Sequence, residues 1–192
     1  MTTAIVPAAG TSSRMGKQNK LLLPFRKKTI IETVIHQLEQ SRVDEIIVVL
    51  GYEADKIQQL LANVNVRFTT NDDYLSGMTS SIQAGIRVGN KHTDGYLICL
   101  SDMPFLTSAD YDQMIDAVSG VKEILVPYYA NRKGNPVFFS SHFGQEILNH
   151  QEPEGCRGVV QDNRQFIRKI PFDNKHILMD IDTIVDFRNL RG

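Results

Sequence analysis

The N-terminal part of the chain combines a short apolar run with a loop of small and basic residues, and it reads Ala4-Ile5-Val6-Pro7-Ala8-Ala9-Gly10-Thr11-Ser12-Ser13-Arg14-Met15-Gly16-Lys17-Gln18-Asn19-Lys20. The apolar residues 4–6 predict a buried strand, and the loop behind it holds two glycines and three cations. Small residues let backbone N–H groups approach an anion closely, and cations neutralise it. The loop therefore suits a polyphosphate, although an ordinary basic surface loop has a similar composition.

The spacing within this loop separates it from two well-known phosphate-binding motifs. Five residues stand between Gly10 and Gly16 where a P-loop has four, and Gln18 replaces the magnesium-binding hydroxyl of that motif. The dinucleotide fingerprint Gly-x-Gly-x-x-Gly is also missing. The sequence thus predicts a phosphate loop of a third kind.

The composition is that of an ordinary globular protein, with 192 residues, 42% of them hydrophobic, and a formal net charge of −1. We expect no nucleic-acid partner, because there is no basic excess, and no membrane partner, because no apolar stretch reaches the roughly 18 residues of a spanning helix. No signal peptide is recognisable, so a cytoplasmic location is expected. Cys99 is expected to be a buried thiol and Cys156 a surface thiol in a loop. We expect one domain over residues 1–192.

Strand-like runs alternate with helix-period segments up to residue 127. Strands are predicted at residues 4–6, 45–50, 64–68, 95–100 and 123–127, and helices at residues 29–40, around 57–61, 79–88 and 107–118. This alternation predicts an α/β fold, a three-layer αβα sandwich around a mostly parallel sheet.

The pattern changes in the C-terminal half. Residues 135–139 form a strand-like run after a turn-rich segment, which predicts an added antiparallel element. A short helix at 143–149, a polar loop at 151–158, a strand near 167–170, a run at 177–182 and a terminal helix from residue 183 are expected to follow.

Three aspartates are candidates for a metal site. Asp102 directly follows a predicted buried strand, and open parallel sheets bind ligands beyond the carboxyl ends of their strands. Mg²⁺ is normally held by one or two carboxylates plus substrate phosphates. Asp180 and Asp182 are two residues apart, so on a strand they would share a face and could complete the site. Capping of a turn by Asp102 and of a helix by Asp182 are the structural alternatives.

Two further segments are candidates for ligand contacts. Ser80 and Ser81 lie near the start of a predicted helix, where free N–H groups and hydroxyls suit a base, a phosphate or a carboxylate. Simple N-capping is the alternative for these residues. The segment Lys133-Gly134-Asn135-Pro136 could line the rim of the pocket, or form a plain turn.

Together these blocks resemble the nucleotidyltransferase superfamily, which includes sugar-phosphate pyrophosphorylases and molybdenum cofactor enzymes. The resemblance is closer to the molybdenum cofactor cytidylyltransferases and runs from about residue 4 to 187. Its motifs are Pro7-Ala8-Ala9-Gly10, Arg14-Met15-Gly16, Asn19-Lys20-Leu21-Leu22, Gly77-Met78-Thr79-Ser80-Ser81, Asp102-Met103-Pro104, Gly134-Asn135-Pro136-Val137 and Asp180-Ile181-Asp182-Thr183. Departures fall on the acceptor side, where Asn135 replaces a common His and Cys156 a common Asp, and at the terminal helix, where residues 184–186 replace a common Pro-Glu-Asp.

The resemblance implies a Rossmann-like fold and a Mg²⁺-dependent transfer of a nucleoside monophosphate, CMP from CTP, to the phosphate of molybdopterin. On the nucleotide side it implies that Ala8, Ala9 and Gly10 cradle the triphosphate, that Arg14 contacts the leaving phosphates, that Lys20 neutralises charge, and that Ser80 and Ser81 contact the nucleotide. The implied Mg²⁺ ligands are Asp102, Asp182 and Asp180. The implied contacts to the acceptor are Gly134, Asn135, Pro136 and Arg157. A molybdoenzyme is an implied partner. A sugar-phosphate acceptor and a non-catalytic molybdenum cofactor carrier or insertion protein are the alternatives.

Overall fold

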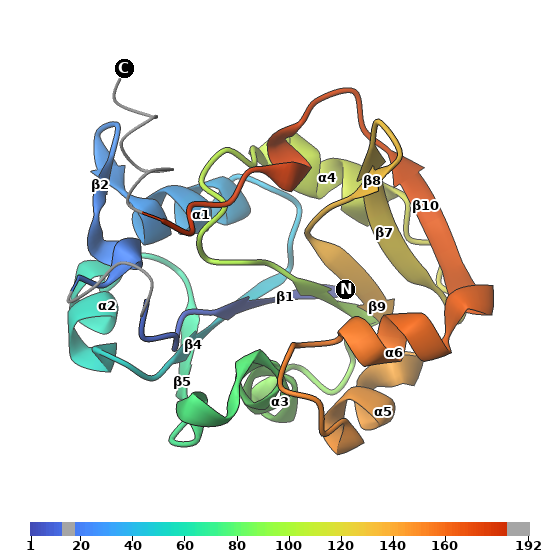
Figure 1. Ribbon diagram of the computed structural model, residues 1–192, viewed down its shortest axis with the longest axis horizontal. Helices are drawn as coiled ribbons and strands as arrows, with labels where there is room; N and C mark the ends of the chain where they lie inside the picture. The colour runs from blue at the N-terminus through green and yellow to red at the C-terminus, as the bar shows by residue number, and fades with distance from the viewer. Residues whose placement is uncertain (13–17, 184–192) are drawn as a thin grey trace.

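The computed structural model describes residues 1–12 and 18–183, and Figure 1 shows a central sheet with helices on both sides. The strands of the sheet are β1 (Thr2–Pro7), β4 (Glu45–Leu50), β5 (Arg67–Thr70), β6 (Gly95–Ile98), β7 (Ile124–Tyr129), β8 (Arg132–Lys133), β9 (Val137–Ser140) and β10 (Ile167–Pro171). The helices are α1 (Ile30–Glu39), α2 (Ala54–Leu60), α3 (Met78–Val88), α4 (Ser108–Asp116), α5 (Gly144–Asn149) and α6 (Arg157–Asp162). A separate two-stranded hairpin consists of β2 (Pro24–Phe25) and β3 (Lys28–Thr29).

The sheet is mostly parallel and follows the order β10-β7-β9-β6-β1-β4-β5, with β8 paired to β7. The pairs β1–β4, β1–β6, β4–β5 and β7–β10 are parallel. Strand β9 is antiparallel to both of its neighbours, β6 and β7, and β8 is antiparallel to β7. The predicted α/β class and the antiparallel element in the C-terminal half are therefore confirmed.

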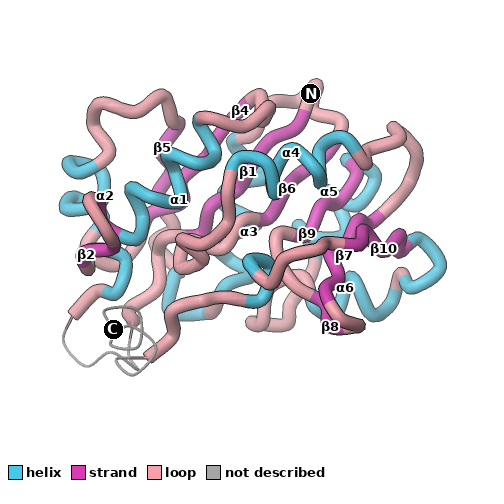
Figure 2. The backbone as a smooth tube through the Cα atoms, turned by 90° about the horizontal axis from the view of Figure 1, so that it is seen from above, coloured by secondary structure: helices cyan, strands magenta, loops and turns pink. Residues whose placement is uncertain are grey.

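Alternating side chains of each central strand build two separate cores, because successive residues of a strand point to opposite faces. On β1, Ala4 and Val6 belong to one core and Ile5 to the other. The first core contains apolar residues of α1, α2 and α4, and the second contains those of α3, α5 and α6. Figure 1 shows the resulting three layers, with α1 and α4 on one side of the sheet and α3, α5 and α6 on the other, and Figure 2 shows α1 and α4 from above together with the strands.

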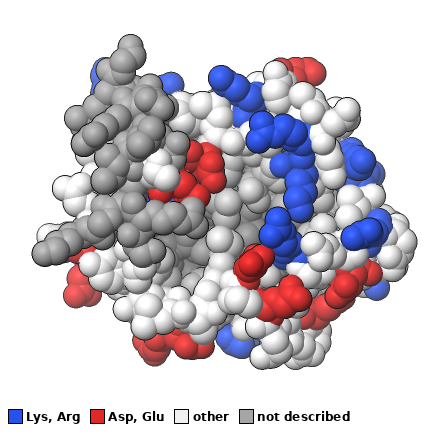
Figure 3. All heavy atoms as spheres, viewed as in Figure 1, with Lys and Arg blue, Asp and Glu red and all other residues white. Residues whose placement is uncertain are grey.

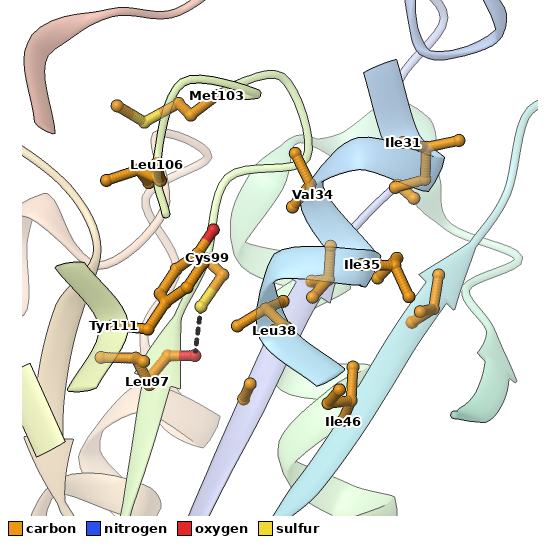
Figure 4. Close-up of a cluster of buried hydrophobic side chains, with 14 of the residues drawn as sticks. Ile31, Val34, Ile35, Leu38, Ile46, Leu97, Cys99, Met103, Leu106 and Tyr111 are labelled. Carbon is orange, nitrogen blue, oxygen red and sulfur yellow. Dashed lines mark hydrogen bonds between the residues drawn. The ribbon is translucent and has the colours of Figure 1, made fainter. Parts of the chain in front are cut away.

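The first core is centred on α1, whose apolar side chains recur at helical spacing. Figure 4 shows Ile31, Val34, Ile35 and Leu38 of α1 in one cluster with residues of the sheet such as Ile46, and all five are buried. Thr29 begins this helix with a capping box, in which its side chain accepts from the Glu32 backbone N–H while the Glu32 carboxylate accepts from the Thr29 N–H. Periodicity and cap together explain why this helix could be predicted closely.

The C-terminal third departs from the expected elements. The polar loop expected at 151–158 ends in a short helix, α6, whose Val159 is buried in the second core. The run at 177–182 is no strand: a 3₁₀ turn, His176–Leu178, leads into irregular backbone. Strand β5 begins at Arg67, three residues later than the expected start at residue 64. The terminal helix expected from residue 183 lies beyond the described residues. None of the described helices is both long and apolar enough to cross a membrane.

Candidate functional site

A cavity of about 460 Å³ opens at the carboxyl ends of the central strands. Its walls come from the loop after β1, the loop after β6 and the start of α3, and they include Gly10, Lys20, Ser81, Asp102 and Asp182. The first two of these loops are joined directly, because the Ser101 hydroxyl donates a hydrogen bond of 2.7 Å to the Pro7 carbonyl. Parallel sheets place ligand sites at this edge, and the cavity follows that rule.

The loop after β1 offers only part of its backbone to this cavity. The Ala8 N–H donates to the Val49 carbonyl at 2.8 Å, so it is already used in fixing the loop to β4. Ala9 and Gly10 line the cavity, and a Cβ added at Gly10 would meet nothing within 4 Å. Of the three residues predicted as a triphosphate cradle, the structure therefore brings Ala9 and Gly10 to the cavity and places Ala8 behind it. Arg14, predicted to hold the leaving phosphates, lies outside the described residues.

Lys20 lies between two carboxylates that come from distant parts of the chain. Its Nζ is 2.5 Å from Asp102 Oδ2 and 2.8 Å from Asp182 Oδ1. Only 15% of the Lys20 side chain and 16% of the Asp102 side chain are exposed, so solvent screens this pair weakly. Burial acts to lower the pKa of Lys20, but the charge of Asp102 and hydrogen bonds to Asp102 and Asp182 outweigh it and raise that pKa. Lys20 therefore stays protonated at neutral pH.

The carboxylates of this cluster fit a hard divalent cation that is shared with a ligand. The second oxygen of Asp102, Oδ1, is buried and has no hydrogen-bond partner among the described atoms. Such an oxygen is costly to bury unless a ligand satisfies it. The described residues hold no group of three or more His, Cys, Asp or Glu side chains able to bind a metal. Two carboxylates match Mg²⁺, which completes its shell with water and phosphate oxygens.

Asp180 does not join Asp102 and Asp182 in the cavity wall. Its residue is exposed and is absent from the cavity lining, because the irregular backbone of this segment breaks the alternation that a strand would impose. Partial desolvation raises the pKa of Asp180, and the negative charges of Asp102 and Asp182 raise it further. The charges of Asp102 and Asp182 thus act on Asp180, although Asp180 does not line the cavity.

The start of α3 separates the two predicted serines. Ser81 lines the cavity, whereas the Ser80 hydroxyl donates to the Gly77 carbonyl at 2.8 Å and is not part of the lining. Both hydroxyls accept hydrogen bonds from Asn71 Nδ2, at 2.8 Å for Ser80 and 3.0 Å for Ser81. Asn71 was not predicted from the sequence. Its position directly after a strand is the signal that could have found it, because the same signal pointed to Asp102.

A second cavity of about 280 Å³ adjoins the first, and the two share Met78 and Leu100 in their walls. Of the four predicted acceptor contacts, Gly134, Asn135 and Arg157 line it, and Pro136 does not. Cys156 also lines this cavity and is only 9% exposed, so the expectation of a surface thiol is wrong. Burial raises the pKa of Cys156 to about 12, because the loop before α6 folds onto the second core.

The two cavities lie on a face with separated charges. Figure 3 shows acidic side chains to the left of a hollow on this face and a column of basic side chains to its right. Lys133 and Arg157 are exposed basic residues in the wall of the second cavity. One cavity thus presents the carboxylates of Asp102 and Asp182. The other presents Lys133 and Arg157, and Arg157 is ion-paired at 3.1 Å with Glu154 in the same wall.

Comparison with known proteins gives one family. The chain matches the family described as MobA-like NTP transferase domain over residues 4–168. It is 30% identical over 184 residues to the molybdenum cofactor cytidylyltransferase of Escherichia coli (strain K12), which covers 95% of this chain and 92% of that protein. It is 35% identical over 185 residues to the nicotine blue oxidoreductase of Paenarthrobacter nicotinovorans, covering 88% and 83% of the two chains.

Solved structures are also similar to this chain. Rv0371c from Mycobacterium tuberculosis H37Rv superposes with a TM-score of 0.88 at 28% identity, covering 98% of this chain and 96% of that one. A crystal structure of the same protein in complex with manganese superposes with a TM-score of 0.83 at 26% identity, covering 98% and 97%. The likeness extends over almost the whole of both chains.

Proposed function

Because the chain is a nucleotidyltransferase of the MobA-like NTP transferase family, we propose that it transfers CMP from CTP to the phosphate of molybdopterin and releases pyrophosphate. The family gives the kind of reaction and a nucleoside triphosphate as substrate. The choice of CTP and of molybdopterin is supported by the Escherichia coli cytidylyltransferase, which is similar along 95% of this chain.

The observation that carries the proposal is the cluster of Lys20, Asp102 and Asp182 in the wall of one of two adjoining cavities. Nucleotidyl transfer requires positioning of two phosphates and neutralisation of their charge rather than a protein nucleophile. The Lys20 ammonium, the carboxylates of Asp102 and Asp182 and the basic residues of the neighbouring cavity meet both requirements.

In the proposed reaction, an oxygen of the acceptor phosphate attacks the α-phosphorus of CTP. A new P–O bond forms there while the bond from the α-phosphorus to the bridging oxygen of the β-phosphate breaks, and that oxygen leaves with pyrophosphate. Lys20 would move from the carboxylates to the α-phosphate and stabilise the charge that develops on it. The backbone of Ala9 and Gly10 would bind the triphosphate, and Arg14 would hold its leaving part.

We propose Mg²⁺ as the cation of this site, held by Asp102 and Asp182, where it would neutralise phosphate charge. The manganese complex of the similar Mycobacterium tuberculosis protein supports a divalent cation. On the acceptor side, Asn135 and Arg157 would contact the pterin phosphate from the second cavity, and Ser81 would contact the nucleotide. Asp180 is left outside the proposed set of ligands.

The test is a pyrophosphate-release assay with each of CTP, GTP, ATP and UTP, with and without molybdopterin. Release from CTP that depends on molybdopterin supports the proposal. Release with a sugar phosphate in place of molybdopterin supports a sugar-phosphate nucleotidyltransferase instead. Tight binding of molybdopterin without release supports a carrier. Asp102→Asn is the matched control, since it keeps the size of the side chain and removes the charge that the cation requires.

A further inference from the structure

The segment of residues 174–182, called the strap below, brings Asp182 to the active site without regular secondary structure beyond one 3₁₀ turn. In Figure 1 the red part of the chain that follows β10 crosses the upper face of the molecule toward α1. A segment without helix or sheet hydrogen bonds needs other contacts to hold its backbone in place. The strap has three such fastenings, and each joins it to a different part of the fold.

The first fastening is at the start of α4. Asn174 Nδ2 donates a hydrogen bond of 2.8 Å to Asp110 Oδ1, and His176 Nδ1 lies 3.0 Å from Asp110 Oδ2. Asp110 is only 4% exposed, and its carboxylate also accepts from the backbone and hydroxyl of Thr107, both at 2.8 Å. One buried carboxylate therefore serves two purposes: it caps α4 through Thr107 and holds the strap through Asn174 and His176.

The second fastening is at Gly134, in the wall of the second cavity. The Asn135 N–H donates to the Ile177 carbonyl at 3.0 Å, and the Gly134 N–H donates to the Pro127 carbonyl at 2.9 Å. A Cβ at Gly134 would lie 2.3 Å from the Ile177 carbonyl oxygen, closer than any side chain tolerates. Glycine is thus required here because the strap backbone passes directly over it.

The third fastening joins the strap to the loop that carries Asp102. The Ile181 N–H donates to the backbone carbonyl of Asp102 at 3.0 Å. Ile177 and Ile181 are both fully buried in the first core, so they anchor the strap on either side of its irregular part. Asp182, the next residue, is thereby set beside the residue whose carboxylate it must meet.

We propose that Asn174, His176 and Gly134 are positioning residues for divalent-cation binding, which act by holding the strap so that Asp182 faces Asp102. The inference rests on the proposed function, since it takes these two carboxylates as the cation site. Lys20 bridges the two carboxylates, and without that bridge their like charges repel each other, so the backbone has to hold them in place once the ammonium leaves. Gly134 on this view acts through Ile177 and Asp182, and not only as part of the acceptor cavity.

The same contacts would be present if these residues served stability alone. Asp110 offers a control that separates the two roles, because its carboxylate accepts from Thr107 on one side and contacts the strap on the other. Thr107→Ala removes the hydroxyl hydrogen bond to this carboxylate on the side of α4 and keeps the one from the backbone N–H of residue 107. The double variant Asn174→Ala/His176→Ala removes hydrogen bonds to the same carboxylate on the side of the strap. Both variants should lose stability, but only the second loosens Asp182. Gly89→Ala is the matched control for Gly134→Ala, because its new Cβ would meet its nearest neighbour at an ordinary 3.5 Å.

The experiment is a titration of the full chain with Mn²⁺ alone, followed by the EPR signal of the free ion, with thermal unfolding measured in parallel. We expect Asn174→Ala/His176→Ala and Gly134→Ala to weaken Mn²⁺ binding by roughly tenfold, the size of effect seen when a residue that orients a metal ligand is lost. Thr107→Ala and Gly89→Ala should keep the wild-type affinity.

The outcomes separate the two proposals. If the wild type binds Mn²⁺ and Asp182→Asn loses it, the cation site stands, and wild-type affinity in the strap variants would then overturn the positioning role alone. An equal loss in Thr107→Ala would also overturn it, since a general loss of stability would explain both. If the wild type binds no Mn²⁺, or Asp182→Asn binds it normally, the cation site itself is wrong. Should Gly134→Ala fail to fold, the double variant still decides the question.

Discussion

Single side chains carry most of the chemistry, and Lys20 is the clearest case. Its ammonium contacts Asp102 and Asp182, which stand 82 and 162 residues further along the chain. The same two carboxylates form the proposed cation site. An ammonium and a divalent cation both carry positive charge, so they compete for these oxygens, and the competition ends when a phosphate draws the ammonium away. On the proposed function, Lys20 would therefore link cation binding to nucleotide binding.

This competition predicts that Lys20→Met changes the rate of transfer and the affinity for Mn²⁺ in opposite directions. Nucleotidyl transfer should fall by roughly 10²–10³-fold, because a contact to the charge developing in the transition state is lost. Mn²⁺ binding without nucleotide should become tighter, because the competing charge is gone. The measurements are pyrophosphate release and an Mn²⁺ titration. Lys27→Met, at an exposed lysine, should change neither, and weaker Mn²⁺ binding in Lys20→Met would contradict the competition.

A buried tyrosine gives a second prediction about a single side chain. Tyr111 is fully buried in the first core, and its hydroxyl has no hydrogen-bond partner among the described atoms. An unpaired buried hydroxyl costs about 1–3 kcal/mol. Tyr111→Phe should therefore keep or raise the free energy of unfolding, by up to about 1 kcal/mol in urea denaturation. A loss of stability above about 1 kcal/mol would show that the hydroxyl has a partner.

Among the elements, the close packing of α3 on the sheet depends on a helical glycine. A Cβ at Gly85 would lie 2.6 Å from Ile5 Cγ2 of β1 and 3.2 Å from Val49 Cγ2 of β4. Both contacts belong to β-branched side chains in central strands, which have little freedom to move. The start of α3 lines the cavity that contains Lys20 and Asp102, so this packing also sets the position of Ser81.

Gly85→Ala should therefore destabilise the protein by about 1–3 kcal/mol, the usual cost of overpacking a core. The sign is informative, because alanine favours a helix over glycine by about 1 kcal/mol and would stabilise an uncrowded site. Chemical denaturation measures the change. Gly89→Ala, at the end of the same helix, should be nearly neutral, and a stabilised Gly85→Ala variant would mean that α3 sits further from β1.

For the molecule as a whole, the ion-paired groups predict how stability depends on pH. Burial alone would raise the pKa of Asp110, but hydrogen bonds from Thr107, Asn174 and His176 outweigh it and hold that pKa below its usual value. A carboxyl whose pKa is lower in the folded state stabilises the protein when ionised. Its contribution is complete above the unfolded-state pKa of about 3.9 and is lost as the pH falls through the folded-state value.

Asp110→Asn should accordingly lose less stability than the wild type as the pH falls below about 4. The melting temperature of the wild type and the variant, recorded from pH 6 down to pH 2.5, measures the effect. The two curves should differ most at pH 6 and converge as the pH falls. Curves that stay parallel over this range would show that Asp110 does not contribute to the loss of stability at low pH.

Local pattern was enough to predict much of this fold. The strand at residues 45–50 was placed correctly, and α1, α3 and α4 were placed to within about two residues, because each carries a full apolar face and two of them carry a capping box. The errors fall where contacts with distant residues outweigh local preference. Helix α6 lies in a polar, glycine-containing stretch and is held by the packing of Val159, which no local pattern reveals.

The sequence alone determined the mostly parallel sheet, and it gave the loop after the first strand, together with Lys20, Asp102, Asp180 and Asp182, as candidates for the site, because each of these inferences depends on residues that are neighbours in the chain. It could not separate Asp182 from Asp180, since the strap follows no strand geometry. Tertiary structure alone made that choice, and it also buried Cys156, brought Asn71 to Ser81 and set Lys20 between two carboxylates. Contacts across more than 80 residues depend on how the layers pack, and no local period records them.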